Sequence, residues 1–291
     1  MSESGRFLLS IMAVLLVLGV TPVPAAGQQG SGVGAAAPAG PIPRTPDGKP
    51  DLTGSWAERM NLTHTVILEE HAGGFGVTAG RGLIVDPPDG IIPYQPWALA
   101  ERNRRREDAN GYEDPVGHCE PYDIGRIHGF PKQIFYSGND IIINAWQHST
   151  RAIAMDRREH LPEGVRLWQG DPIGQWEGDT LVVETTNFNG KTRMSIGGDF
   201  YSPDAVLVER YTMVDADTIH WTLTVTDPSV FTRPWTMTSD VPMTRGTLPA
   251  SGSNFDAEDV CHEGNVSLLH MKNVYDQARE TAPAANETDS P

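Results

Sequence analysis

The sequence predicts a mainly β protein whose strands close into one antiparallel, up-and-down, lipocalin-like β-barrel of about eight strands, with short flanking helices. Eight strand-like segments follow one another between Lys132 and Val241 with almost nothing helical between them, and tight turns join several of them. Eight sequential antiparallel strands are enough to close a barrel around side chains or one small ligand. A β-sandwich is the alternative, although it would leave edge strands that a barrel removes.

The predicted strands are rich in β-branched and aromatic residues and are bounded by turn signals. Gly138-Asn139 and Gly178-Asp179 suit the positive φ angles of two-residue hairpins. Between residues 217 and 227, Ile, Trp, Leu and Val alternate with His and Thr, which indicates a strand with one buried face. The eight segments are Lys132–Ser137, Asp140–Gln147, Thr150–Asp156, Ile173–Glu177, Thr180–Thr186, Ala205–Val214, Asp217–Asp227 and Arg233–Val241.

Two short helices are expected on the flank of the barrel. Tyr94–Asp108 has Pro96 near its start and a run of arginines near its end, where the helix dipole favours cations. Asn265–Ala278 carries apolar residues at rough helical spacing. The arginine run is more typical of a solvated face than of a binding patch.

The chain of 291 residues divides into four parts. Residues 1–27 have the order of a cleavable secretory signal, because a short apolar run follows Arg6 and small residues follow the run. The run is short for a membrane span, although an uncleaved anchor is the alternative. Residues 28–44 predict a disordered linker, residues 45–279 one barrel domain, and residues 280–291 a disordered tail. The expected location is therefore secreted or periplasmic.

The formal charge is −16, with 38 acidic residues against 22 lysines and arginines. Such a chain repels phosphate and polyuronate backbones, so nucleic acid, anionic membranes and acidic glycans are poor candidates for partners. A small neutral or hydrophobic ligand is expected instead. No phosphate-binding glycine loop, nucleophile elbow or dinucleotide fingerprint occurs, and no cofactor is predicted.

Cys119 and Cys261 are the two cysteines, and an even pair in a secreted chain predicts one disulfide bridge. Each cysteine has a histidine beside it, so a Cys/His metal site is the alternative. The spacing includes neither C-x-x-C nor H-x-x-x-H, and we therefore expect no metal.

Polar residues at strand ends and loops form the candidate catalytic site. His160 suits general acid/base work, because its ordinary pKa lies near neutrality. Asp171 or Asp156 would orient its ring, and Arg158 would stabilise a developing oxyanion. The alternative is that the arginines pair with carboxylates across strand ends and that His160 binds a loop carbonyl.

A second set of residues is predicted to bind the substrate. Trp168 and Trp176 would form an apolar wall next to the charged cluster. His220 would contribute only if its strand face lies inside the barrel; outside, that face is ordinary exposed sheet. The full predicted set is Arg151, Trp168, Trp176, Glu177, His220 and Arg233.

Three strings resemble a large group of secreted, mostly uncharacterised bacterial proteins that is numerous in Acidobacteria and their relatives. The strings are RTPDGKPDLTGSW at 44–56, GQWEGDTLVVETTNF at 174–188 and DPSVFTRPW at 227–235. Members of the group usually read DGRxHP where this chain reads DRREHL at 156–161. The resemblance implies an extracytoplasmic bacterial origin and supplies no activity.

Together these features predict a secreted or periplasmic enzyme without a cofactor, of the lyase, isomerase or cyclase type. It would act by general acid/base catalysis on a small neutral or hydrophobic substrate. The main alternative is a non-catalytic extracytoplasmic barrel that binds a ligand. A structural envelope protein is a third possibility, and it would need no internal cavity.

Overall fold

The computed structural model describes residues 40–57, 67–73, 79–107, 113–128, 130, 132–145, 149–156, 159–239 and 242–246. The elements in these ranges are β1 (Gly54–Ala57), β2 (Ile84–Asp86), α2 (Pro96–Arg106), η2 (Pro115–His118), α3 (Ile124–Ile127), β3 (Lys132–Ser137), β4 (Asp140–Ala145), β5 (Ser149–Ala154), β6 (Asp171–Glu177), β7 (Thr180–Thr186), β8 (Val206–Asp215), β9 (Thr218–Thr226), β10 (Trp235–Thr238) and β11 (Met243–Arg245).

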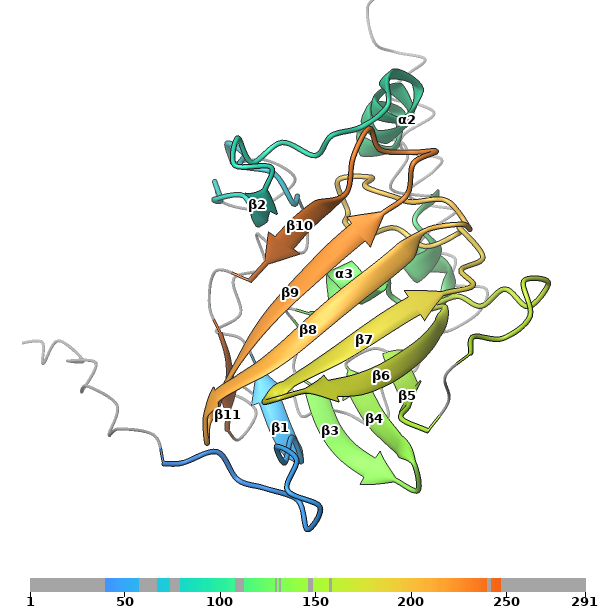
Figure 1. Ribbon diagram of the computed structural model, residues 1–291. Coiled ribbons are helices and arrows are strands. Elements are labelled where there is room, and N and C mark those ends of the chain that lie inside the picture. The colour runs from blue at the N-terminus through green and yellow to red at the C-terminus, as the bar shows by residue number, and fades with distance from the viewer. Residues whose placement is uncertain are drawn as a thin grey trace, which may run out of the picture. The chain divides into compact units, whose positions relative to one another are not determined.

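Nine of the described strands form a closed barrel in the order β1, β3, β4, β5, β6, β7, β8, β9, β11 (Figure 1). The ring closes because β11 pairs with both β9 and β1. β10 also pairs with β9, and it carries β2 on its other edge, so these two strands branch off the ring. All pairings within the ring are antiparallel except that of β5 with β6, which is parallel at Ala154 and Ile173.

The predicted barrel is confirmed, and its finer description differs in two respects. The ring has nine strands rather than eight, because β1 and β11 complete it while β10, from the last predicted strand, branches off. The ring is mixed rather than up-and-down, because β6 runs parallel to β5. A parallel pair needs a long crossover, and the connection between β5 and β6 spans 155–170. Closure of the ring excludes the sandwich.

Local sequence signals account for much of the ring. Gly138 and Gly178 have φ values of 60° and 59°, and they join β3 to β4 and β6 to β7, as the two glycine turns predict. In β9, Trp221 and Leu223 are buried, whereas His220 is exposed on the opposite face. The alternation therefore directs its apolar side chains into the barrel and leaves His220 outside.

α2 confirms the first predicted helix, with proline in its first turn and three arginines in its last. The second predicted helix, the signal peptide, residues 28–39 of the linker and the tail lie outside the described residues. Among the described residues, no helix is both long and apolar enough to cross a membrane.

The barrel has two different ends. At the mouth end lie the β3–β4 and β6–β7 hairpins together with residues 44–53. At the loop end lie the long connections 113–128, 187–205 and 227–234, with α2 beyond them (Figure 1).

Candidate functional site

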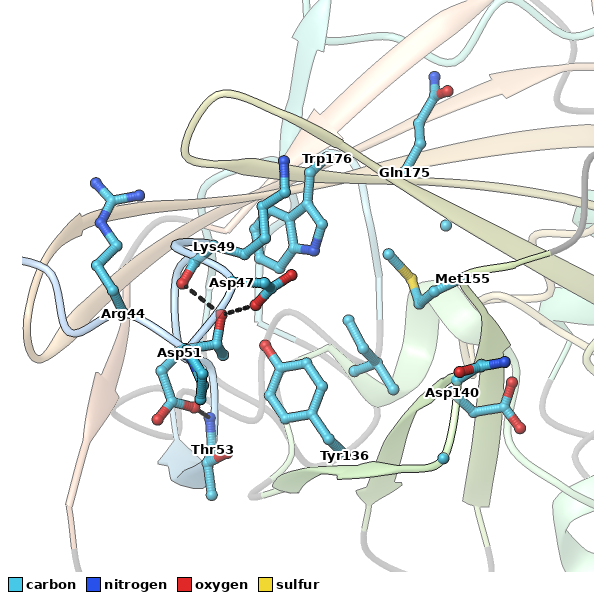
Figure 2. A pocket seen from close by; sticks show the side chains of 16 residues that line it. Arg44, Asp47, Lys49, Asp51, Thr53, Tyr136, Asp140, Met155, Gln175 and Trp176 are labelled. Atoms are coloured by element: carbon cyan, nitrogen blue, oxygen red, sulfur yellow. Dashed lines mark hydrogen bonds between the residues drawn. The ribbon is translucent and has the colours of Figure 1, made fainter.

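A cavity of about 830 Å³ opens at the mouth end of the barrel (Figure 2). Three stretches that are far apart in the sequence line it: residues 44–53, the β3–β4 hairpin and the end of β6, with Met155 beside them. Its size is typical of a pocket for a small molecule, and barrel mouths commonly hold such pockets.

One wall of the mouth cavity is apolar. Trp176 lines it and packs partly against the barrel core, and Ile141 and Met155 continue the same surface. Trp176 therefore lines a cavity, but not the one beside His160 where the wall was predicted, because Trp176 is absent from the lining of the His160 cavity. Trp168, the other tryptophan of that prediction, does not line the mouth cavity and lies instead beneath the ammonium of Lys191, 5.8 Å from the ring centre.

Gly174 allows this wall to form. A Cβ atom at this position would lie 2.4 Å from Sδ of Met155 and 2.8 Å from Cγ2 of Ile153. Such distances are too short for ordinary contacts, so a larger residue would push β6 away from the end of β5. The glycine therefore lets the single parallel pairing of the ring form beside the cavity.

Residues 44–53 form the polar rim of the cavity, and several contacts fix them, among them hydrogen bonds from Arg245 to the carbonyls of Asp51 and Thr53. Nη1 of Arg44 lies 2.5 Å from Oδ1 of Asp179, at the tip of the β6–β7 hairpin. The hydroxyl of Tyr136 donates a hydrogen bond to the carbonyl of Pro50 at 3.1 Å. The rim is thus attached to two different hairpins of the mouth.

Carboxylates dominate the rim. Asp47, Asp51 and Asp140 line the cavity, with Lys49 and Arg44 among them (Figure 2). Ionised carboxylates accept hydrogen bonds and donate none, so this rim favours ligands that carry hydroxyl or amide donors. It also disfavours anionic ligands.

Two pKa shifts describe the charge at the rim. Burial raises the pKa of Tyr136, and the carboxylates of Asp51 and Asp47 raise it further, so the phenol keeps its proton at neutral pH. The hydrogen bond from Arg44 lowers the pKa of Asp179. The rim therefore combines a neutral hydroxyl at Tyr136 with an ionised carboxylate at Asp179.

His160 lies at a second and smaller cavity of about 170 Å³, whose lining shares Gly174 and Gln175 with that of the mouth cavity. Its Nδ1 is 3.1 Å from Oδ2 of Asp171, and its Nε2 is 3.2 Å from Oε1 of Glu184. The same oxygen of Asp171 accepts a hydrogen bond from the amide of Leu161 at 2.9 Å. The predicted approach of His160 to Asp171 is present, and Glu184 is a partner that the sequence reading missed.

The small cavity faces the outside of the barrel. Ile173 and Glu184 line it and pair across β6 and β7, whereas Val183, beside Glu184 on β7, is fully buried in the core. His160 thus contacts a surface opposite to the barrel interior. Neither described cavity contains both His160 and His220 among its lining residues.

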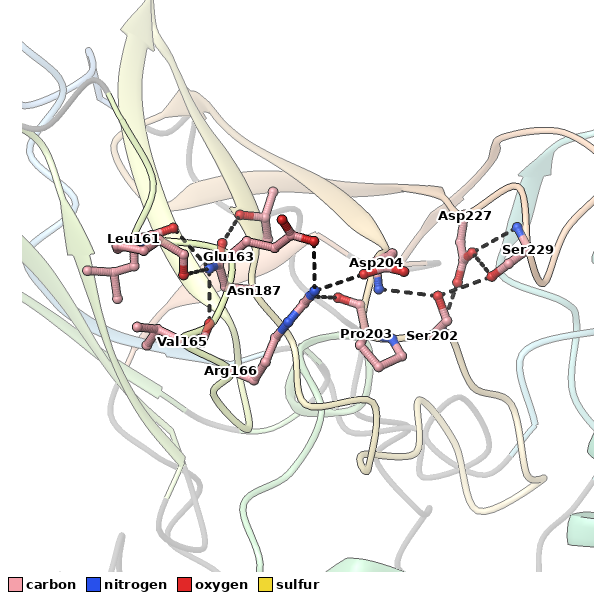
Figure 3. Close-up of polar contacts among 12 residues, drawn as sticks. Leu161, Glu163, Val165, Arg166, Asn187, Ser202, Pro203, Asp204, Asp227 and Ser229 are labelled. Carbon is pink, nitrogen blue, oxygen red and sulfur yellow. Dashed lines mark hydrogen bonds and ion pairs between the residues drawn. The ribbon is translucent and has the colours of Figure 1, made fainter.

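The loop after His160 is held by Asn187, which adopts a left-handed conformation with φ of 60° (Figure 3). Its amide nitrogen donates to the carbonyls of Leu161, Pro162 and Val165 at 3.0 to 3.1 Å. Asparagine tolerates this backbone region better than most residues. Asn187, part of the string TTNF, therefore fixes the loop that carries His160.

The ring of His160 has an acceptor beside each nitrogen. A neutral imidazole can donate to one of them only, whereas a protonated ring donates to both. This geometry stabilises the position of the ring and holds a proton between His160 and a carboxylate. A substrate would have to displace Glu184, whose side chain is 56% exposed, to reach Nε2.

Other members of the predicted catalytic cluster lie elsewhere. Asp156 accepts a hydrogen bond from the side-chain amide of Asn139 at 2.9 Å, beside the mouth, whereas the ring nitrogens of His160 lie beside Asp171 and Glu184. Arg158 lies outside the described residues. His220 is exposed on the outer face of β9, which agrees with the alternative of an ordinary exposed strand face.

Two predicted binding residues form ion pairs at the surface. Glu177 lies 2.9 Å from Arg210, and Arg233 lies 2.5 Å from Asp86. All four side chains are at least 43% exposed. These are exposed surface ion pairs rather than a binding cluster, and neither pair lines the mouth cavity or the His160 cavity.

Arg151 was predicted to bind substrate, but the structure buries it inside the barrel. Nη2 of Arg151 lies 2.7 Å from Oε2 of Glu209, and both side chains are 1% exposed. Glu209 also accepts from the hydroxyl of Tyr211 at 2.7 Å and from the indole of Trp221 at 3.2 Å. Burial opposes the charge of Arg151, but Glu209 outweighs it and raises the pKa of Arg151. The pair therefore belongs to the barrel interior.

The described residues include no free cysteine. Cys119 follows η2 with a positive φ of 67°. Cys261 lies outside the described residues, so the predicted bridge and its metal alternative stay predictions.

The mouth cavity was missed because its lining comes from three distant stretches, although the turn-rich string at 44–56 marks one of them. The buried Glu209 could have been found by alternation, since it shares its face of β8 with Leu207 and Tyr211. The chain matches no protein-family model, no curated protein and no solved structure.

Proposed function

We propose that the protein is a secreted or periplasmic binding protein whose mouth cavity takes one small neutral ligand with an apolar face. The observation that carries the proposal is the cavity of about 830 Å³ between Trp176 and the carboxylate rim. An apolar wall that faces polar groups can hold and orient a small ligand, and this cavity has both.

The chemistry of the lining selects the ligand class. A flat apolar face would pack on Trp176 and Met155, which lie on the same side of the cavity. Hydroxyl or amide donors at the edge of the ligand would reach Asp47 and Asp51. An anionic ligand would be repelled by these carboxylates and by the charge of −16 of the whole chain.

N-phenyl-1-naphthylamine is a suitable first probe, because it is neutral, aromatic and fluorescent in apolar surroundings. We expect saturable binding to the purified protein and a loss of about tenfold in affinity in Trp176→Ala, since a buried aromatic contact contributes roughly 1 to 2 kcal/mol. Trp168→Ala removes a half-buried tryptophan outside the cavity and is the matched control. Equal affinities of the two variants would refute the proposed site.

One contact favours a second function, acid/base catalysis at the outer cavity. Nδ1 of His160 lies 3.1 Å from Oδ2 of Asp171. A carboxylate that orients a histidine ring is common in enzymes that transfer protons. We rank this function second, because Glu184 occupies the other ring nitrogen and the cavity holds only about 170 Å³.

The fate of a neutral compound separates the two functions. Compounds that raise the melting temperature would be incubated with the protein, and their NMR spectra compared before and after. A binding protein returns each compound unchanged. Conversion that disappears in His160→Gln, while N-phenyl-1-naphthylamine still binds, would favour catalysis over the proposed binding function.

A further inference from the structure

We infer that the ligand of the mouth cavity is a short neutral oligosaccharide, which stacks one sugar ring on Trp176 and forms hydrogen bonds to the rim through its hydroxyl groups. This inference rests on the proposed binding function and names the class of ligand. The cavity of about 830 Å³ lies in the upper part of the range of small-molecule pockets, roughly 300 to 1,000 Å³, so it has room for more than one sugar ring.

Polar side chains outnumber apolar ones around this cavity (Figure 2). Of the 16 lining residues, ten carry a charged, amide or hydroxyl group, two are glycines, and the other four are Pro46, Ile141, Met155 and Trp176. Pockets for drug-like ligands are lined predominantly by apolar side chains. The ligand of this cavity must therefore present hydrogen-bonding groups along most of its edge and an apolar face on one side. A pyranose ring has this division, because its hydroxyls project from the edge and C–H groups cover its faces.

The rim holds carboxylate oxygens that the fold does not use. Oδ1 of Asp51 accepts from the amide of Thr53 at 2.9 Å, and Oδ1 of Asp47 accepts from the hydroxyl of Thr45. The second oxygen of each carboxylate has no partner among the described residues. The carboxylate of Asp140 forms neither a hydrogen bond nor an ion pair in the part of the chain that the structure describes. Three acceptors are thus available to the hydroxyls of a ligand.

Donors without a partner lie among these acceptors. Within the described ranges, Nζ of Lys49 and the side-chain amide of Gln175 form no hydrogen bond or ion pair. The indole nitrogen of Trp176 has no described partner either, whereas that of Trp56 donates to the carbonyl of Leu52 at 2.8 Å. The cavity therefore offers both donors and acceptors to a ligand.

This mixture of donors and acceptors separates a sugar from charged ligands. A hydroxyl group both donates and accepts, so a molecule with several hydroxyls can pair with the carboxylates and with the donors at the same time. A carboxylate ligand would pair with the donors only, and an ammonium ligand with the acceptors only. Hydrogen bonds from hydroxyls to Asp47, Asp51 and Asp140 would also be strengthened by the charge of the acceptor.

Trp176 provides the surface on which a sugar ring would stack. Its side chain is partly buried and packs against the barrel core, and the remainder borders the cavity beside Met155. The indole is thus held in place before a ligand arrives, which lowers the entropic cost of binding. The C–H groups on the face of a sugar would pack on this flat apolar surface, while the hydroxyls at its edge reach the rim.

The test uses four neutral trisaccharides, namely cellotriose, xylotriose, β-1,4-mannotriose and maltotriose. Isothermal titration calorimetry on the purified protein measures their affinities, and displacement of N-phenyl-1-naphthylamine locates them. We expect at least one trisaccharide to bind saturably and to displace the dye. Sorbitol, which has hydroxyls but no ring face, and trigalacturonate, which is anionic, should bind at least about tenfold more weakly than that trisaccharide.

Two variants test the contacts of the bound trisaccharide. Asp51→Asn should weaken it by about fivefold, because a neutral amide accepts a weaker hydrogen bond than a carboxylate does. Asp89→Asn is the matched control and should leave the affinity unchanged. Asp89 accepts from the amide of Ile91 at 3.0 Å, as Asp51 does from that of Thr53, but it lies outside the cavity lining. Trp176→Ala should weaken binding by at least about tenfold.

Three results would overturn the inference. If the dye binds and depends on Trp176 but none of the four trisaccharides displaces it, the ligand class is wrong and the proposed binding function stands. A trisaccharide whose affinity is the same for the unmodified protein and for Asp51→Asn occupies another surface. Failure of both the dye and the trisaccharides to bind would remove the proposed function together with this inference. Asparagine keeps an oxygen for the bond from Thr53, so Asp51→Asn reports on the site even if Trp176→Ala fails to fold.

Discussion

The two ends of the barrel use carboxylates in opposite ways. At the loop end, Asp123 is 1% exposed and accepts from the hydroxyls of Tyr201 and Thr192 and from the amide of Gly125. At the mouth end, Asp47 accepts on one oxygen from the hydroxyl of nearby Thr45, is exposed, and lines an open cavity. Buried carboxylates with several donors organise the loops, whereas carboxylates at the mouth are accessible to a ligand.

Asp227 extends the same contrast. It is 2% exposed and accepts from the amide of Ser202 at 2.7 Å and from the amide and hydroxyl of Ser229 at 3.1 and 2.6 Å (Figure 3). Both carboxylate oxygens of Asp227 therefore already accept hydrogen bonds, and these bonds link the connection 187–205 to the connection 227–234. A polar side chain is informative about binding only when its acceptors are not already used by the fold.

The largest expected effect concerns the buried charge pair of the interior. Glu209→Ala should lower the free energy of unfolding by about 3 to 5 kcal/mol, because Arg151 would stay buried without its partner. Glu177→Ala removes a carboxylate from an exposed pair with Arg210 and should cost about 0 to 1 kcal/mol. Urea unfolding measures both values. A cost below about 1 kcal/mol for Glu209→Ala would remove the energetic difference between interior and mouth.

A smaller effect should distinguish the two ends: the contributions of Asp123 and Asp179 to the free energy of unfolding should change with pH in opposite directions. Burial raises the pKa of Asp123, so its folded form binds a proton more readily than its unfolded form does. The stability that Asp123 contributes is fully present below its ordinary pKa of 3.8 and is lost as pH rises through the raised value. Asp179, whose pKa is lowered by Arg44, behaves oppositely and loses its contribution as pH falls below 3.8.

The measurement compares variants across pH. The stability of the protein minus that of Asp123→Asn should decrease from pH 3.8 upward, whereas the difference for Asp179→Asn should decrease from pH 3.8 downward. Thermal unfolding in a series of buffers gives both curves. Parallel slopes for the two variants would contradict the contrast between a desolvated carboxylate and an ion-paired one.

Features of the fold that depend on residues close together in the sequence were predicted, because turn glycines and strand alternation are local signals. Gly138 and Gly178 fixed two hairpins, and alternation in β9 separated Trp221 from His220. β1 and β11 have only four and three residues, and they pair with each other although they are far apart in the sequence. No local sequence pattern predicts strands of this kind. The parallel pairing of β5 with β6 also depends on the path of a long loop.

The same distinction applies to the sites. His160 and Asp171 are eleven residues apart, and their contact at 3.1 Å follows from a local loop. The mouth cavity needs residues 44–53 to fold back onto two hairpins, and only Trp176 of its wall was predicted. Arg151 was assigned to substrate, because an arginine in a strand gives no local sign of whether it will meet a buried glutamate.

The smallest expected effect tests how the rim is attached at the mouth. Tyr136→Phe removes the hydroxyl that donates to the carbonyl of Pro50 at 3.1 Å and keeps the aromatic ring in the cavity wall. A single hydrogen bond of this kind contributes about 0.5 to 1.5 kcal/mol, so global stability should change little. Hydrogen exchange within residues 44–53 should nevertheless become faster, because the rim would lose its attachment to the β3–β4 hairpin and keep those to Asp179 and Arg245. Unchanged exchange there, with Phe135→Leu on the opposite face of β3 as the control, would mean that Tyr136 serves the cavity wall alone.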